Sequence, residues 1–258
     1  MNRRTRRRLA QAAVAGSPEP DRETEMEAMD DREPAGTTPS AQGKAAASPP
    51  LATTSLELRM AQGWELEKAG HVDRAMDLFR SILSKHPENL AATYALGTLY
   101  EKVGDHLAAL ELYEKAKRLD PENMEVLLNH ANALVVLGRF DLAEKELRRA
   151  ARFEPNRPEI YTMLGIVQFR RGLYAQADHE LRRAIELNQD SAVAYHYRGE
   201  SLNQLGKVDE ALAMMERAVA LEPSNARTYY VMGILLDKKH RPQEAGAMFR
   251  KARSLTPA

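Results

Sequence analysis

The sequence predicts an all-α protein in which one helical hairpin is repeated six times. Ten of the 14 glycines fall into two series in which the step from one position to the next is 34 residues. Alanines and prolines recur at the same spacing. A spacing kept along most of a chain is typical of arrays in which each unit packs only on its neighbours. The two glycine series are Gly63, Gly97, Gly165, Gly199 and Gly233, with Ala131 in the missing step, and Gly70, Gly104, Gly138, Gly172 and Gly206.

Each series has a physical role in a hairpin. The first places a small residue on the first helix and the alanine series, such as Ala109 and Ala143, places one on the second, so that two helix backbones can approach closely. The second glycine series lies in the turn, where a C-terminal cap needs a positive φ. A recurrent proline, as in Pro121, ends the second helix.

This pattern resembles the tetratricopeptide repeat (TPR) family, whose unit is a 34-residue pair of antiparallel helices. The resemblance implies a TPR α-solenoid, a right-handed superhelix of six helix pairs. Departures from the pattern are Ile82 for an alanine, Gln189 for a proline and His240 for a turn glycine. The repeats are expected at 56–89, 90–123, 124–157, 158–191, 192–225 and 226–258.

Residues 1–55 differ from the rest and are predicted to form a disordered arm. They hold six of the 13 prolines and are rich in alanine, serine and threonine, so they cannot bury enough apolar area to offset the entropy of ordering. Thr54 and Glu57 have the spacing of a capping box, which predicts that the first helix begins there.

Five arginines stand at the start of the arm, and they have three interpretations. A solvated basic tail is favoured, with at most weak contact to acidic lipid or nucleic acid. A twin-arginine export signal is an alternative, but the apolar stretch after Leu9 is short. A transit peptide is disfavoured by the eight acids of residues 19–33. We therefore expect a cytoplasmic location. The arginines are Arg3, Arg4, Arg6, Arg7 and Arg8.

The sequence offers little for catalysis, and we expect no enzyme, no cofactor and no metal. The chain has no cysteine, which excludes a thiolate zinc site and a cysteine nucleophile. It has no Walker loop, dinucleotide turn, HExxH or nucleophile elbow. His196 and Glu200 are four residues apart on one helix face, but two ligands make a poor metal site, so a polar patch on a binding surface is favoured. No apolar run reaches the ~18 residues of a membrane span.

Aromatic residues predict the binding surface. Ten of the 15 are expected in the core, namely Phe79, Tyr100, Tyr113, Phe140, Tyr161, Tyr174, Tyr195, Tyr229, Phe249 and Phe153. The other five lie on first helices, which by the resemblance face a concave groove. Large aromatic side chains are typical anchors there, and asparagines add amide groups for peptide backbone. The expected partner-binding groove contains Trp64, Tyr94, Asn129, Asn132, Phe169, His196, Tyr197 and Tyr230.

The charges restrict the partner. The family's carboxylate clamp for chaperone tails is absent, since groove position 2 carries Glu57, Glu125 and Glu159 and position 5 has no lysine. The groove should therefore prefer apolar or aromatic ligands, with some basic character. A net charge of zero gives no reason to expect specific nucleic-acid binding.

The sequence thus predicts a scaffold or adaptor that binds a peptide or helix of a protein partner. Residues 226–258 carry a net charge of +5, which could solubilise that end or dock an acidic partner. Two alternatives stay open: self-assembly through the ends of the array, and a regulatory subunit of an enzyme or of a secretion or envelope assembly complex.

Overall fold

The computed structural model describes residues 51–256, which form twelve helices and contain no strand. The chain divides into two compact units, Met1–Arg59 and Met60–Ala258, and the hairpins considered below belong to the second. The helices are α2 (Leu51–Lys68), α3 (Val72–Lys85), α4 (Leu90–Lys102), α5 (His106–Leu119), α6 (Met124–Val136), α7 (Phe140–Phe153), α8 (Pro158–Arg170), α9 (Tyr174–Leu187), α10 (Ala192–Gln204), α11 (Val208–Leu221), α12 (Ala226–Lys238) and α13 (Pro242–Leu255).

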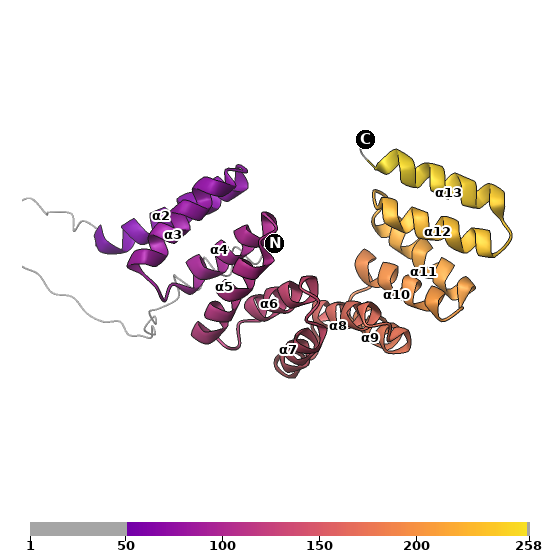
Figure 1. The fold of residues 1–258 in the computed structure, drawn as a ribbon, viewed down its shortest axis with the longest axis horizontal. Coiled ribbons are helices and arrows are strands. Elements are labelled where there is room, and N and C mark those ends of the chain that lie inside the picture. The colour runs from indigo at the N-terminus through magenta and orange to yellow at the C-terminus, as the bar shows by residue number, and fades with distance from the viewer. Residues whose placement is uncertain (1–50, 257–258) are drawn as a thin grey trace, which may run out of the picture. The chain divides into compact units, whose positions relative to one another are not determined.

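The helices are arranged as successive hairpins. From α3 to α13, successive helices of the chain pack against each other (Figure 1). The first helices of the hairpins, α4, α6, α8, α10 and α12, begin at the same position of successive repeats and also contact one another in turn. We call the surface that they share the first-helix face. The predicted all-α solenoid is confirmed.

Each hairpin depends on a close approach at the small residue of its first helix. A Cβ atom added to Gly165 would lie 2.3 Å from Cγ of Leu181, and one added to Gly97 would lie 2.8 Å from Cε1 of Tyr113. The other glycines of this series face Phe79, Met215 and Phe249 in the same way. The glycines are therefore required because a large side chain of the second helix occupies the space of a Cβ atom.

The turn residues adopt the conformation that the sequence predicts. Gly70, Gly104, Gly138, Gly172 and Gly206 all have a positive φ, between 70° and 84°. His240 stands at the same point of the last hairpin with a φ of 57°. The left-handed conformation is thus kept in the turn inside each of the six hairpins, even at His240, where the side chain makes it costly.

Polar side chains at the starts of the first helices were not anticipated from the sequence. The side-chain oxygens of Asn89, Asn123, Ser191 and Asn225 each accept a hydrogen bond from the backbone N–H three residues later. Such caps satisfy a donor that the helix leaves without a partner. They occupy one position of the repeat, as the glycines do.

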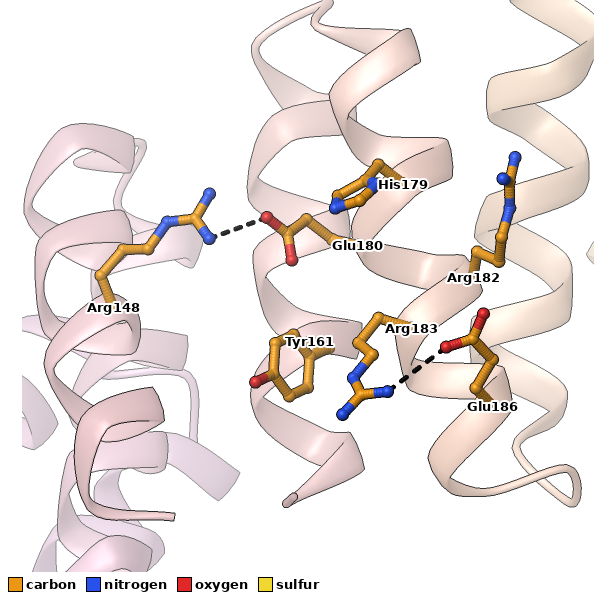
Figure 2. Close-up of a pocket in the computed structure, with 7 residues that line it drawn as sticks. All are labelled: Arg148, Tyr161, His179, Glu180, Arg182, Arg183 and Glu186. Atoms are coloured by element: carbon orange, nitrogen blue, oxygen red, sulfur yellow. Dashed lines mark hydrogen bonds and ion pairs between the residues drawn. The ribbon is translucent and has the colours of Figure 1, made fainter. Parts of the chain in front are cut away.

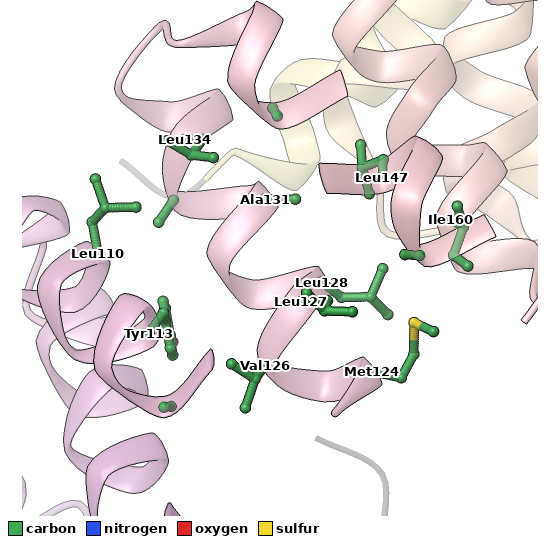
Figure 3. Close-up of a cluster of buried hydrophobic side chains, with 14 of the residues drawn as sticks. Leu110, Tyr113, Met124, Val126, Leu127, Leu128, Ala131, Leu134, Leu147 and Ile160 are labelled. Atoms are coloured by element: carbon green, nitrogen blue, oxygen red, sulfur yellow. The ribbon is translucent and has the colours of Figure 1, made fainter. Parts of the chain in front are cut away.

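The largest part of the core lies around α6. Side chains of α5, α6, α7 and α8 converge there, with Leu127, Leu134 and Leu147 almost wholly buried (Figure 3). The expectation that Phe153 belongs to the core is wrong, because its side chain is 42% exposed at the end of α7 and lies under the guanidinium of Arg149. The leucines at the same repeat position, such as Leu119 and Leu187, are partly buried.

The start of the array also differs from the expectation. Helix α2 begins at Leu51, so Thr54 lies inside it and does not mark its first residue. Most of the predicted disordered arm, residues 1–50 with its arginines and acids, lies outside the described residues. Within the described part, no helix is both long and apolar enough to cross a bilayer.

His130 is a buried histidine whose two ring nitrogens have no hydrogen-bond partner among the described residues. Burial lowers the pKa of its imidazole, and the ammonium of Lys117 lowers it further, while Glu146 and Glu114 oppose both effects. The folded chain therefore holds His130 neutral.

A Gly165→Ala variant should unfold at lower urea concentration, with a loss of about 1–3 kcal/mol, because the new methyl group collides with Leu181. Gly246→Ala is the matched control. Gly246 lies inside α13, and its added Cβ would meet only the end of Arg250 at 3.5 Å, so the same change there should stabilise the helix by about 0.5–1 kcal/mol. Equal effects of the two variants would contradict the close-approach account.

A His240→Gly variant should be more stable by about 1 kcal/mol, because glycine adopts the left-handed turn without a Cβ penalty. Gly206→Ala should lose a similar amount for the opposite reason. The midpoint of urea unfolding measures both. A loss of stability in the His240→Gly variant would show that its imidazole makes a stabilising contact.

A His130→Leu variant should make the chain less sensitive to acid. Since the pKa of His130 is lower in the folded chain, the unfolded chain takes up its proton first, and stability falls as the pH drops below about 6.5. The difference in unfolding free energy between the variant and the wild type should therefore grow from about pH 7.5 to about pH 5.5. A constant difference would mean that His130 titrates normally.

Candidate functional site

Two predicted groove residues come together on the first-helix face. Phe169 of α8 and Tyr197 of α10 form an edge-to-face pair with ring centroids 5.6 Å apart, and the ring centroid of Tyr174 of α9 is also 5.6 Å from that of Phe169. All three rings are partly exposed. We call Phe169, Tyr174 and Tyr197 the aromatic cluster. Such a cluster can receive an apolar or aromatic side chain of a ligand.

A polar network of the buried His196, Glu200 and Thr228 and the exposed Arg227 adjoins this cluster. The imidazole of His196 stands edge-to-face against the ring of Tyr197, and its Nδ1 is 2.9 Å from Oγ1 of Thr228. Its Nε2 is 3.4 Å from Glu200, which also accepts a hydrogen bond of 2.9 Å from Arg227. Four polar residues of α10 and α12 thus hold the orientation of Tyr197.

The charge of Glu200 is stabilised within this network. Burial alone would raise the pKa of its carboxyl, but hydrogen bonds and charge from His196 and Arg227 hold that pKa below its ordinary value. Glu200 therefore stays ionised and serves as a structural anion. His196 and Glu200, which the sequence analysis expects as a polar patch on a binding surface, are buried and engaged with each other, Thr228 and Arg227.

Other predicted groove residues are engaged within the protein. Tyr94 is buried in the core and accepts a hydrogen bond of 2.7 Å from the amide of Asn129. Burial raises the pKa of its phenol, which stays neutral. The amide of Asn132 donates to Glu101, which also accepts from Tyr113. The structure therefore uses these side chains to join α4, α5 and α6, and the ring of Tyr94 is closed to a ligand.

The acidic character expected of the groove is reduced by one arginine. The guanidinium of Arg157 lies 2.6 Å from Glu125 and 3.4 Å from Glu159. Glu57 is exposed in the other unit of the chain. The carboxylates on α6 and α8 are thus matched internally, which favours apolar over basic ligands.

The two remaining aromatics lie at the ends of the array. Trp64 is half-buried on α2. Tyr230 on α12 is 56% exposed, and its ring centroid is 5.5 Å from that of Phe249 on α13. These two rings line a cavity of about 710 Å³ together with Ala226, Arg227, Ala252, Arg253 and Thr256.

A second cavity, of about 450 Å³, lies over the second helices α7 and α9 (Figure 2). Its charged side chains are paired: Arg148 with Glu180 at 2.8 Å and Arg183 with Glu186 at 3.4 Å, as the dashed lines in Figure 2 mark. The guanidinium of Arg183 also stands over the ring of Tyr161. This cavity is bounded by an ion-pair network that ties two hairpins together.

No group of three or more histidines, aspartates or glutamates within residues 55–256 could hold a metal ion. The sequence reasoning missed Tyr174 as a member of the exposed cluster, because its repeat position is usually in the core. It also missed Thr228, whose contact with His196 spans two hairpins.

Comparison with known proteins agrees with this architecture. Family models described as tetratricopeptide repeat match residues 60–123, 101–165, 162–226 and 198–258. No significant match is found among curated proteins.

Solved structures of such repeats are similar to the chain. The crystal structure of MamA is 28% identical, with 62% of this chain and 94% of MamA covered and a TM-score of 0.54. YrrB, titled a TPR protein with an unusual peptide-binding site, is 26% identical, with 69% and 92% covered and a TM-score of 0.51. The PilF protein of Pseudomonas aeruginosa, at 21% identity, 80% and 94% coverage and a TM-score of 0.68, shows the shared fold alone. Because the family matches together run from residue 60 to residue 258, the chain belongs to the tetratricopeptide repeat family.

Proposed function

We propose that the chain is a scaffold or adaptor that binds a peptide or helix of a partner protein on its first-helix face. TPR proteins are in general non-enzymatic scaffolds for protein–protein interaction, and this chain carries their repeats throughout its described hairpins. YrrB, which is similar to 69% of this chain, is described as a TPR protein with an unusual peptide-binding site.

The aromatic cluster is the observation that carries the proposal. Phe169 and Tyr197 come from consecutive first helices, and their rings remain partly exposed although neighbouring apolar side chains are buried. Aromatic side chains contribute large contact area with few rotatable bonds, and they dominate the energy of many interfaces. The preferred ligand is a segment with at least one apolar or aromatic side chain.

The other groove residues have graded roles in this proposal. His196 is a positioning residue, since it contacts Tyr197 and is itself buried. Asn129 and Asn132 use their amide nitrogens in the hydrogen bonds to Tyr94 and Glu101, and those bonds leave their amide oxygens for a ligand backbone. Trp64 is an outer contact.

The proposal includes neither catalysis nor a cofactor. Two carboxylates of the first helices are engaged in ion pairs, Glu200 with Arg227 and Glu125 with Arg157. Cytoplasmic location, self-assembly and a regulatory role within a larger complex stay predictions of the sequence.

Peptides selected from a random displayed library on the wild-type chain should bind a Phe169→Ala, Tyr197→Ala double variant at least about 30-fold more weakly, because two central aromatic anchors are lost. Dissociation constants by fluorescence anisotropy measure this. Leu107→Ala with Leu142→Ala, two exposed apolar residues of the second helices α5 and α7, is the control and should bind normally.

A Phe169→Leu, Tyr197→Leu variant separates binding from folding, since leucine keeps most of the apolar volume while removing the rings. Circular dichroism establishes that each variant is folded. Unchanged affinity in both folded groove variants, or equal losses in the control, would contradict the proposal.

A further inference from the structure

The last hairpin, α12–α13, exposes a surface whose equivalents in the preceding hairpins are covered. Phe249 of α13 is only partly buried. The residues at the same repeat position in the earlier hairpins are all 0% exposed, namely Phe79, Tyr113, Leu147, Leu181 and Met215. Tyr230 is 56% exposed, whereas the corresponding Tyr94, Leu128 and His196 are 5–7% exposed and Thr162 is partly buried.

The covering element in each earlier case is the hairpin that follows. Helix α5 packs against α6, α7 against α8, α9 against α10 and α11 against α12. No described helix follows α13. The cavity between Tyr230, Phe249 and Arg253 therefore continues a helix–helix interface that the rest of the array uses repeatedly.

Two cations on this face occupy positions at which Lys117 and Arg148 pair across that interface, whereas Arg182 at the second of these positions pairs within its own helix with Asp178. Arg250 occupies the repeat position of Arg148, which lies 2.8 Å from Glu180 of the following hairpin. Arg253 occupies the position of Lys117, which lies 3.2 Å from Glu146 of the following hairpin.

The two interior partners share one position. Glu146 and Glu180 stand at the same place in consecutive repeats, each on the second helix of its hairpin. Arg250 and Arg253 are exposed, and among residues 55–256 neither makes an ion pair. By analogy with Lys117 and Arg148, a carboxylate at the place of Glu146 and Glu180 on a covering hairpin would meet these two cations.

We propose that the face of Tyr230, Phe249, Arg250 and Arg253 binds a helical hairpin of a partner protein, which continues the array. Apolar residues of the first helix of that hairpin would cover the two rings. A glutamate or aspartate on its second helix would meet the two guanidinium groups. This is a second interaction surface, separate from the aromatic cluster.

A second copy of this chain suits the face less well. Its first hairpin, α2–α3, carries Leu78 at the position of Glu146 and Glu180, and Arg74 lines the same outer surface. Stacking that hairpin on α13 would leave Arg250 and Arg253 without the carboxylate that Lys117 and Arg148 meet on the following hairpin. Glu65 lines the surface too, but on the first helix, at a position where no interior hairpin carries an acid.

The test extends the full chain by one asparagine and by a second copy of residues 158–191, the hairpin α8–α9 that contains Glu180. The asparagine completes the register of the last repeat and caps the added helix. Hydrogen exchange of backbone amides is then followed in α12 and α13. The added hairpin should slow exchange in α13 at least about tenfold, because it covers the open face.

Charge exchange makes the test specific. Arg250→Glu with Arg253→Glu should abolish the added protection. Replacing Glu180 of the added copy by lysine should abolish it as well. The two changes together should restore it. Lys145→Glu with Arg152→Glu, exposed cations of α7, is the control and should leave the protection intact. The result is independent of the Phe169 and Tyr197 variants, so either proposal can fail alone.

Two results would overturn the proposal. The first is that the added hairpin leaves hydrogen exchange in α13 unchanged, or that it protects α13 equally in the wild type and in the charge-reversed variants. The second is concentration-dependent self-association of the unextended wild type, measured by sedimentation, that Arg250→Glu with Arg253→Glu removes, because the occupant would then be a second copy. A wild type that stays monomeric, together with a restored charge exchange, supports a partner hairpin.

Discussion

The close approach of two helices at one small residue is the constraint on which the array depends. In each hairpin a glycine of the first helix, or alanine at residue 131, faces a large side chain of the second. That side chain occupies the space of the missing Cβ atom, as Leu181 does at Gly165. Because this contact fixes the geometry of each hairpin, residues at the same repeat position lie at equivalent places in successive hairpins.

This repetition separates structural from binding surfaces. Buried residues such as Tyr113 and Leu147 fill the space between helices, and ion pairs such as Arg148 with Glu180 tie one hairpin to the next. The first helices contact one another in turn, and some of their side chains, such as Phe169 and Tyr197, pack on the core while staying partly exposed. The aromatic cluster lies there because Phe169 and Tyr197 come from neighbouring first helices and meet across the gap between them.

The sequence was sufficient wherever backbone geometry dictates the residue. The positive φ of Gly206 and the space at Gly165 are properties of one hairpin, and the period of the glycines reveals them directly. Contacts between hairpins were harder to predict. Tyr94 shares a helix stripe with other groove residues, yet Asn129 of the next hairpin helps to close it off. Phe153 is apolar at a position expected in the core, but its side chain is 42% exposed at the end of α7.

Hydrogen exchange of the chain bound to a selected peptide tests the central claim most directly, since it reports which helices the ligand covers. The account predicts new protection in α8 and α10, around Phe169 and Tyr197, with little change in the second helices α7 and α11. Protection confined to the second helices, with α8 and α10 unchanged, would contradict a binding site on the first-helix face.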